Sequence, residues 1–272
     1  MEPSLEHYRQ VQSVGIHGLF YSEIEQKVLT RWIGSSVFPE MVPSLDNPDG
    51  IRNDFHRNIE LAANPPFAQY YRPGEEDRPV IRAKAHLMAS IATDPTSVLW
   101  GFADMFADRR DLSPVPHKLF DFGAQHGLQA FRSAAFYYAH PETPEEQRHS
   151  ALVDAYRFLC GVAVEVLGPG YFPQWVSTSP TSGFVVLTSD FSPAPPPITF
   201  EDVFHQLTDL LIMSVTNRYD FGLGLRGLAR HLNWVFANPA PNVFHLGPHG
   251  GPEYIEVRMD GPEGTVRRLP VA

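Results

Sequence analysis

The sequence is poor in cysteine, and Cys160 is the only one among 272 residues. A single cysteine cannot close an internal disulfide and cannot build a cysteine-rich zinc site. We therefore expect a reducing compartment. The chain also begins with Met-Glu-Pro-Ser-Leu-Glu-His, which lacks the basic start of a signal peptide, so a cytoplasmic protein is predicted.

Long apolar runs and an excess of positive charge are missing as well. No apolar run approaches the length of about 18 residues that suggests a spanning helix, so no transmembrane segment is expected. The chain carries 21 Lys and Arg against 31 Asp and Glu, a formal net charge of −10. Because nucleic-acid binding needs clustered cations, we expect no nucleic-acid partner.

Familiar nucleotide and hydrolase motifs are also lacking. No Gly-x-Gly-x-x-Gly follows a predicted strand, and neither Gly-x-x-x-x-Gly-Lys-Ser/Thr nor Gly-x-Ser-x-Gly occurs. These patterns supply the phosphate-binding turns of dinucleotide and P-loop proteins and the nucleophile of α/β-hydrolases. The sequence therefore gives no support to those classes.

Apolar residues recur at helical spacing over most of the chain, and Pro and Gly separate the segments. The pattern predicts helices over 4–34, 51–63, 79–92, 93–108, 117–140, 143–167, 199–217 and 220–237. Gly15 and Gly18 are expected to loosen or break the first of these. We therefore expect one mainly α domain over residues 1–272, built from about seven to nine helices.

Two later segments differ from the helical pattern. Residues 168–198 form a Pro-rich loop region around one candidate strand near 183–188, and a long loop inside a domain is often functional. Residues 253–270 alternate apolar and polar side chains around a turn, which predicts a small C-terminal β-hairpin.

Arg132 is the only charged side chain between Asp121 and Glu142, within the apolar segment predicted as a helix. A guanidinium cannot lose its charge, so burying it requires an anion. The partner is either a distant Asp or Glu of this chain or the carboxylate of a bound molecule such as an amino acid.

His205 has the most informative surroundings among the 12 histidines, because Asp202 and Asp209 share its predicted helix face. One interpretation is an exposed polar face with weak ion pairs. A second is a metal site built on Asp-x-x-His. A third is an axial heme ligand whose far ring nitrogen is held by a carboxylate.

Glu146-x-x-His149 has the ligand spacing of ferritin-like dimetal sites, and Asp202-x-x-His205 would be an imperfect second copy. Glu146 also lies in the first turn of a predicted helix, where acids are common because they complement the helix dipole. Both a metal site and an ordinary helix start stay open.

Two further histidines and two residues between helices complete the candidates. His17 and His86 are lone histidines with apolar neighbours, which are either satisfied core residues or catalysts. Asn217 and Tyr219 lie where one predicted helix ends and the next begins. They serve either in capping and packing or in lining a pocket beyond the helix of His205.

Two segments carry a resemblance to a known family. Gly127-Leu-Gln-Ala-Phe-Arg132 resembles the Gly-Phe-Gln-Ser-x-x-Phe-Arg helix of tryptophan 2,3-dioxygenase, with two positions missing. The stretch from His17, His-Gly-Leu-Phe-Tyr-Ser-Glu, resembles that family's distal-histidine helix. The family's Gly-Thr-Gly-Gly-Ser loop is absent, which argues against tryptophan dioxygenation itself. The chain is closer in length to the smaller histidyl-heme aromatic oxygenases, including the heme-dependent tyrosine hydroxylases of bacterial secondary metabolism.

The resemblance implies a heme b oxygenase that hydroxylates the ring of an aromatic amino acid, L-tyrosine to 3,4-dihydroxyphenylalanine, with peroxide or oxygen. His205 would be the axial ligand of the iron and His86 or His17 the distal histidine. Arg132 would hold the substrate carboxylate, with Asn217 and Tyr219 at the substrate. The alternatives are a non-heme dimetal-carboxylate oxygenase and a non-catalytic helical ligand-binding protein, and a homodimer is one allowed assembly.

Overall fold

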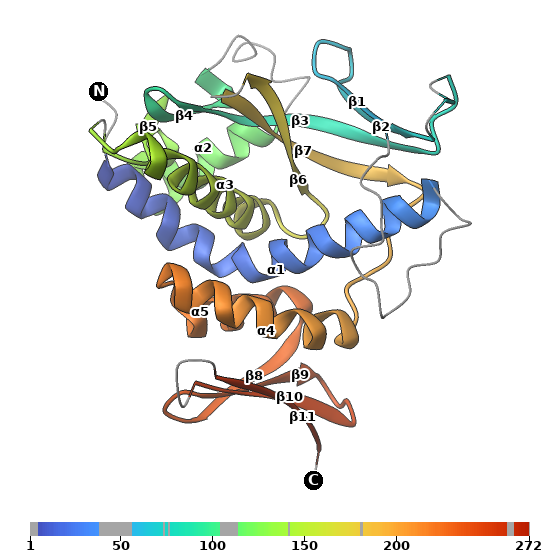
Figure 1. Ribbon diagram of the computed structural model, residues 1–272, viewed down its shortest axis with the longest axis vertical. Coiled ribbons are helices and arrows are strands. Elements are labelled where there is room, and N and C mark those ends of the chain that lie inside the picture. The colour runs from blue at the N-terminus through green and yellow to red at the C-terminus, as the bar shows by residue number, and fades with distance from the viewer. Residues whose placement is uncertain are drawn as a thin grey trace.

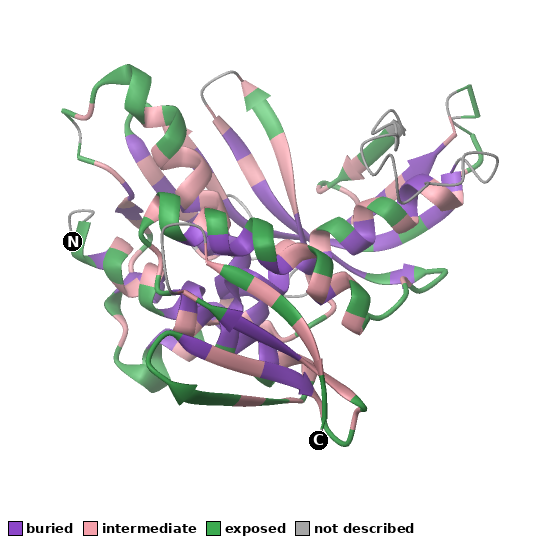
Figure 2. Cartoon of the chain, turned by 60° about the horizontal axis from the view of Figure 1, so that its bottom comes forward, coloured by how far each residue is buried: buried purple, intermediate pink, exposed green. Residues whose placement is uncertain are grey.

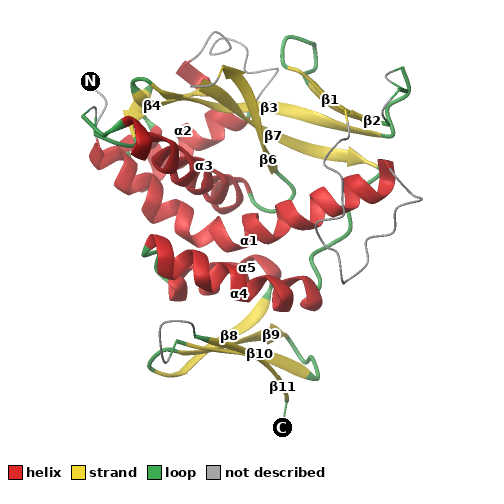
Figure 3. Cartoon of the chain, viewed as in Figure 1, coloured by secondary structure: helices red, strands yellow, loops and turns green. Residues whose placement is uncertain are grey.

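Helices and strands both make up large parts of the structure (Figures 1 and 3). The computed structural model describes residues 5–37, 56–72, 74–75, 77–103, 114–140, 142–179, 182–259 and 264–271. These residues form five α-helices and eleven strands in two antiparallel sheets. The prediction of a mainly α domain is therefore wrong, and the fold is mixed α/β.

The larger sheet has seven strands and curls over one side of the molecule (Figure 1). Its strands are β1 (His56–Glu60), β2 (Phe67–Tyr71), β3 (Ile81–Thr93), β4 (Thr96–Trp100), β5 (Ala135–Tyr137), β6 (Phe172–Ser179) and β7 (Ser182–Ser192). The long strand β3 is central. Its first half pairs with β2, its second half pairs with β4, and its other edge pairs with β7.

Strand β3 lies where the sequence pattern predicts a helix over 79–92, and that prediction is wrong. Ile81, Ala83 and Ala85 are buried while Arg82 and Lys84 are exposed. This alternation is the period of a strand, and the alanines and Pro79 obscured it. The helix predicted over 93–108 is likewise replaced by β4 and the 3-10 turn η2 (Gly101–Ala103), and residues 104–113 lie outside the described residues.

Two more predicted segments change. A helix is expected over 51–63, but residues 56–60 form strand β1, so that prediction is wrong there. Residues 51–55 lie outside the described part of the chain. Residues 168–198, expected as loops around one strand, contain the paired strands β6 and β7. The Pro-rich parts are two short segments, one directly before β6 and one directly after β7.

The long helix predicted over 117–140 is absent. Helix α2 (Val115–His126) ends at Gly127, which adopts φ of +70° and donates its N–H to the Gly123 carbonyl. A left-handed glycine is a common helix end. The 3-10 turn η3 (Gln129–Phe131) and strand β5 follow, so Arg132 lies at a turn and not inside a helix.

Helix α1 (Leu5–Val37) crosses the molecule, with the large sheet, α2 and α3 on one side and α4 and α5 on the other (Figure 1). It stays continuous through Gly15 and Gly18, contrary to expectation. A side chain at Gly18 would collide with the Gly161 carbonyl of α3 (Glu145–Leu167), and one at Gly161 would collide with the Gly15 carbonyl. The glycines therefore permit close contact between α1 and α3.

Helices α4 (Phe200–Asn217) and α5 (Phe221–Leu232) cover the side of α1 away from the large sheet (Figure 1). Thr199 and Asp202 form a reciprocal cap at the start of α4. Helix α5 ends at Asn233 in the left-handed region, so the helix predicted over 220–237 is too long.

The second sheet lies beyond these helices at the C-terminal end (Figure 3). It has the order β11-β10-β9-β8, with strands β8 (Trp234–Ala240), β9 (Val243–Pro248), β10 (Glu253–Arg258) and β11 (Thr265–Pro270). Strands β10 and β11 pair where a hairpin is predicted over 253–270, but they are half of a larger sheet.

Buried residues gather along α1 and at its contacts with sheet and helices (Figure 2). The main core joins α1, α2, α3, α4 and α5 with the central strands. A smaller cluster packs the last turns of α1 against the β2 end of the large sheet through Leu29, Ile33 and Tyr70. Among the described helices none combines the length and apolar character needed to cross a membrane.

Candidate functional site

His205 lies on the exposed face of α4, with 58% of its side chain accessible. Its Nε2 is 3.6 Å from a carboxylate oxygen of Glu201, one turn earlier. The two aspartates expected beside it have other partners. Asp202 caps α4 and contacts Arg31 at 2.5 Å, and Asp209 contacts Lys27 at 3.0 Å.

Arg132 is also exposed, so the premise that it is buried in an apolar helix and needs an anion is wrong. His17 is half-buried on α1, and its backbone carbonyl lies against Gly227 of α5. These two residues of the expected heme site therefore occupy a surface turn and a helix contact.

His86 is buried on β3 and hydrogen-bonds the Ser189 hydroxyl of β7 through Nε2, at 3.1 Å. Its Nδ1 is buried without a partner among the described residues. Burial lowers the pKa of His86 to about 4, so the ring is neutral at physiological pH. His86 and His205 lie on opposite sides of α1 (Figure 1).

Asn217 donates to the Met213 carbonyl at the end of α4, a local capping contact. The Tyr219 hydroxyl donates to Asp154 of α3 at 2.6 Å, and burial raises the pKa of Tyr219. Glu146 and His149 are exposed in the first turns of α3. The described residues contain no group of three or more His, Cys, Asp or Glu placed to hold a metal ion.

A different part of the chain forms the clearest candidate site, a cavity of about 280 Å³ between α1 and the two Pro-rich segments. Residues from α1, from the turn before β6 and from the segment after β7 line it. They are Tyr21, Glu25, Val28, Leu29, Pro169, Gly170, Phe172, Pro195, Pro196, Pro197 and Ile198. We call it the proline-lined cavity.

Among the described residues Glu25 is the one carboxyl side chain in this lining, and only 5% of the residue is exposed. Its Oε1 accepts the N–H of Gly170 at 3.2 Å, whereas its Oε2 is buried without a hydrogen-bond partner among the described residues. Burial raises the pKa of Glu25 to about 8, although the Gly170 amide and the neighbouring Tyr21 oppose this shift. The carboxyl is therefore mostly protonated at neutral pH.

The backbone before β6 brings Gly170 to this carboxyl. Gly168 and Gly170 have φ of +90° and +95°, values that glycine adopts without strain, and Pro169 stands between them. This turn follows the last residue of α3 directly. It connects α3 to β6 and points one N–H at Glu25.

Three polar or charged side chains from α5 and α3 lie near Tyr21. The ring of His231 is 5.5 Å from the Tyr21 ring, and its Nε2 is 3.1 Å from Glu165 of α3. Arg230 binds the same Glu165 oxygen. Arg230 and His231 both bind Glu165, so within the described part of the chain this group leaves no cation for Glu25.

Glu25 was missed by sequence reasoning, although a signal existed. Its helical neighbours on the same face are Tyr21, Val28 and Leu29, so Glu25 is a lone acid on an apolar helix face. A lone charged residue in an apolar predicted helix is also the feature that made Arg132 a candidate, although that helix does not form. In the predicted helix over 4–34, the same feature indicates Glu25.

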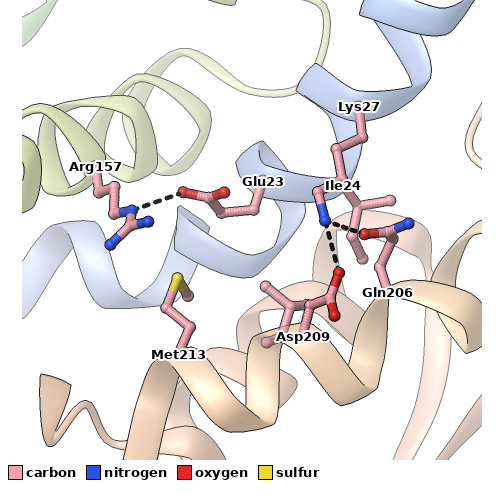
Figure 4. Close-up of a pocket in the computed structure, with 8 residues that line it drawn as sticks. Glu23, Ile24, Lys27, Arg157, Gln206, Asp209 and Met213 are labelled. Carbon is pink, nitrogen blue, oxygen red and sulfur yellow. Dashed lines mark hydrogen bonds and ion pairs between the residues drawn. The ribbon is translucent and has the colours of Figure 1, made fainter. Parts of the chain in front are cut away.

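A second cavity of about 190 Å³ lies between α1, α3 and α4 (Figure 4). Here Glu23 contacts Arg157 at 3.4 Å, and Lys27 contacts Asp209 at 3.0 Å and also binds Gln206. Each carboxylate in this lining faces a cation, as Figure 4 shows. The arrangement is that of charges joining helices, and we call it the ion-paired cavity.

Comparison with known proteins adds one finding. Residues 67–191 match the model of a protein family described as a family of unknown function, DUF6882. No curated protein and no solved structure matches the chain. The matched range holds β2 to β7 with α2 and α3, and it includes Gly170 and Phe172 of the proline-lined cavity. Glu25 and the second Pro-rich segment lie outside it.

Proposed function

We propose that this protein binds a small organic molecule in the proline-lined cavity, with Glu25 as the polar anchor. The observation that carries the proposal is the buried Oε2 of Glu25, which has no partner in the described structure. A buried polar atom without a hydrogen bond lowers stability by roughly 1–3 kcal/mol. A bound molecule that meets this oxygen would recover that free energy.

The rest of the lining fits the usual composition of small-molecule sites, mostly apolar walls with few polar groups. Val28, Leu29, Phe172 and Ile198 supply apolar surface. The volume of about 280 Å³ is just below the range of roughly 300–1,000 Å³ for drug-sized ligands. We therefore expect a ligand with one small ring or a short chain.

Three ring probes of similar size test the proposal: benzylamine, benzyl alcohol and benzoate. Each is titrated into isotopically labelled protein at neutral pH while the amide resonance of Gly170 is followed, because that N–H touches the anchor. We expect at least one probe to shift this resonance, and the shift to vanish in Val28→Phe, which fills the cavity. Failure of all three probes at millimolar concentration would contradict the proposal.

The blocking variant needs its own check, because Val28 is buried. Circular dichroism and the melting temperature establish whether Val28→Phe folds. Pro196→Trp is the second blocking variant, since Pro196 is exposed at the rim and a larger side chain there covers the opening without entering the core.

Heme-dependent hydroxylation of an aromatic amino acid stays a prediction, with heme b on His205 and the substrate carboxylate on Arg132. No comparison bears on it, and both residues are exposed. An absorption spectrum from 350 to 600 nm of protein expressed with added heme tests it. A Soret band that is lost in His205→Ala would support this function.

A further inference from the structure

We infer that the proline-lined cavity takes an organic cation, an amine on a small apolar body, whose ammonium group pairs with Glu25. This inference rests on the proposed function and names the class of ligand. Three properties of the cavity support it: an acid without a counter-charge, a lining with few hydrogen-bond donors, and two aromatic rings.

The first property is the missing counter-charge. No Lys, Arg or His lines the cavity, and Glu25 Oε2 has no partner within the described residues. A carboxylate in such a place is stable only when a cation arrives with the ligand. An ammonium group supplies both the charge and the hydrogen-bond donors that the oxygen lacks.

The second property is the scarcity of donors. Four of the eleven lining residues are prolines, whose backbone has a carbonyl acceptor but no N–H. The Gly170 N–H is already used by Glu25, and the Tyr21 hydroxyl, a second donor in the lining, also interacts with that carboxyl. A ligand rich in donors therefore complements this lining better than a carboxylate or phosphate, which needs donors from the protein.

The third property is aromatic and electrostatic. Tyr21 and Phe172 both line the cavity, and the face of an aromatic ring attracts a cation electrostatically. The formal net charge of −10 also attracts cations over long range and repels anions. Both effects favour an amine over an acid of the same shape.

Few titratable groups of the described residues surround Glu25. Tyr21 comes from α1 itself, and the ring of His231 of α5 lies against the Tyr21 ring. Glu165 of α3 binds both His231 and Arg230. The lining from the turn before β6 and from Pro195–Ile198 adds no titratable side chain. The proton that responds to an incoming cation is therefore that of Glu25.

Binding of a charged amine should exchange the Glu25 proton for the ammonium group of the ligand. In the free protein near pH 7, Glu25 is mostly a neutral acid because its pKa is about 8. When a charged amine binds, the carboxyl releases its proton to solvent and the ammonium takes its place, with no change in oxidation state. The apparent affinity should therefore rise about tenfold from pH 6 to pH 7 and level off above pH 8.

Isothermal titration calorimetry with the same three probes tests this inference. We expect benzylamine to bind tightest, with tighter binding as pH rises from 6 to 8. In buffers of different ionisation enthalpy, its binding at pH 7 should release close to one proton. Glu25→Gln should remove the proton release and weaken benzylamine at pH 8 by at least tenfold. Glu23→Gln, two residues away in the ion-paired cavity, should change neither.

The outcomes separate the two proposals. Tighter binding of benzyl alcohol or benzoate would overturn the cation and keep the cavity as a ligand site. Benzylamine that binds tightest with an affinity independent of pH would keep the cation and overturn the proton exchange, because Glu25 would then be ionised before the ligand binds. Absence of binding by all three probes would overturn the proposed function itself. Proton release is measured on the unmodified protein, so this test holds even if Glu25→Gln folds poorly.

Discussion

Two carboxyl groups of α1, Glu23 and Glu25, stand two residues apart and have opposite surroundings. A helix turns by about 200° over two residues, so they face different sides. Glu23 reaches the ion-paired cavity and meets Arg157, whereas Glu25 reaches the proline-lined cavity and meets no cation among the residues that the structure describes. Burial raises the pKa of both, but Arg157 and Lys27 oppose the shift of Glu23.

The difference indicates two ways of placing an acid inside a fold. Where α1 holds α3 and α4, the acid is balanced by a cation and the pair joins the helices. Where α1 meets the Pro-rich segments, the acid is left unbalanced, which costs stability unless a ligand is present. Stability given up at one position in this way is expected at functional sites.

The largest expected effect comes from removing the unbalanced acid. The folded pKa of Glu25, about 8, lies above the ordinary value of 4.5, so its contribution is fully present below pH 4.5 and is lost as pH rises through 8. Relative to wild type, Glu25→Gln should gain about 1.4 kcal/mol per pH unit from pH 5 to 8, roughly 4 kcal/mol in all.

Urea unfolding at several pH values measures this gain. Glu23→Gln is the matched control: it should lose only the smaller decline that the raised pKa of Glu23 causes, and keep the decline due to Glu25. Wild type and Glu25→Gln curves that run parallel from pH 5 to 8 would show that Glu25 is ionised in the folded protein and that the two acids do not differ.

The sequence indicated several helices well and the large sheet hardly at all. Helices α1, α3 and α4 lie close to their predicted bounds because each has a long apolar period and local start or stop signals. The register of β3 with β7 joins residues about a hundred positions apart, from Arg82 with Ser192 to Ala92 with Ser182. No local pattern reports such a pairing.

The candidate site escaped for the same reason. The attention given to residues 168–198 as a functional loop was well placed, since Pro169, Gly170 and Pro195–Pro197 line the cavity. Glu25, which meets them in the cavity, lies 145 residues before Gly170, and only the fold shows that they meet. Arg132 drew attention because the stop signal of Gly127 was passed over.

A buried base sharpens the contrast with the buried acid. His86 has a folded pKa of about 4, below the ordinary 6.5, so stability is present above pH 6.5 and is lost as pH falls toward 4. Desolvation is the main cause; Asp190 opposes it, and Lys84 and Lys118 add to it. The wild-type protein should lose up to roughly 3 kcal/mol of unfolding free energy as pH falls from 6.5 to 4, and His86→Gln should abolish this loss.

The measurement is again unfolding free energy against pH, now on the acid side. The exposed His205 supplies the control, because His205→Gln should leave the acid limb of the curve unchanged. If His86→Gln follows wild type down to pH 4, the ring is charged in the folded protein, and the buried Nδ1 has found a partner such as water.

The smallest effects are expected from the paired side of α1. Glu23 and Arg157 are each about 30% exposed at 3.4 Å, whereas Lys27 and Asp209 are roughly half exposed or more at 3.0 Å. Double-mutant cycles should give coupling energies of about 1 kcal/mol for the first pair and about 0.5 kcal/mol or less for the second. Both should shrink in high salt because solvent-exposed charges are screened. A coupling of several kcal/mol would mean that these ion pairs are desolvated. The paired acid Glu23 would then affect the free energy of unfolding as strongly as the unpaired acid Glu25.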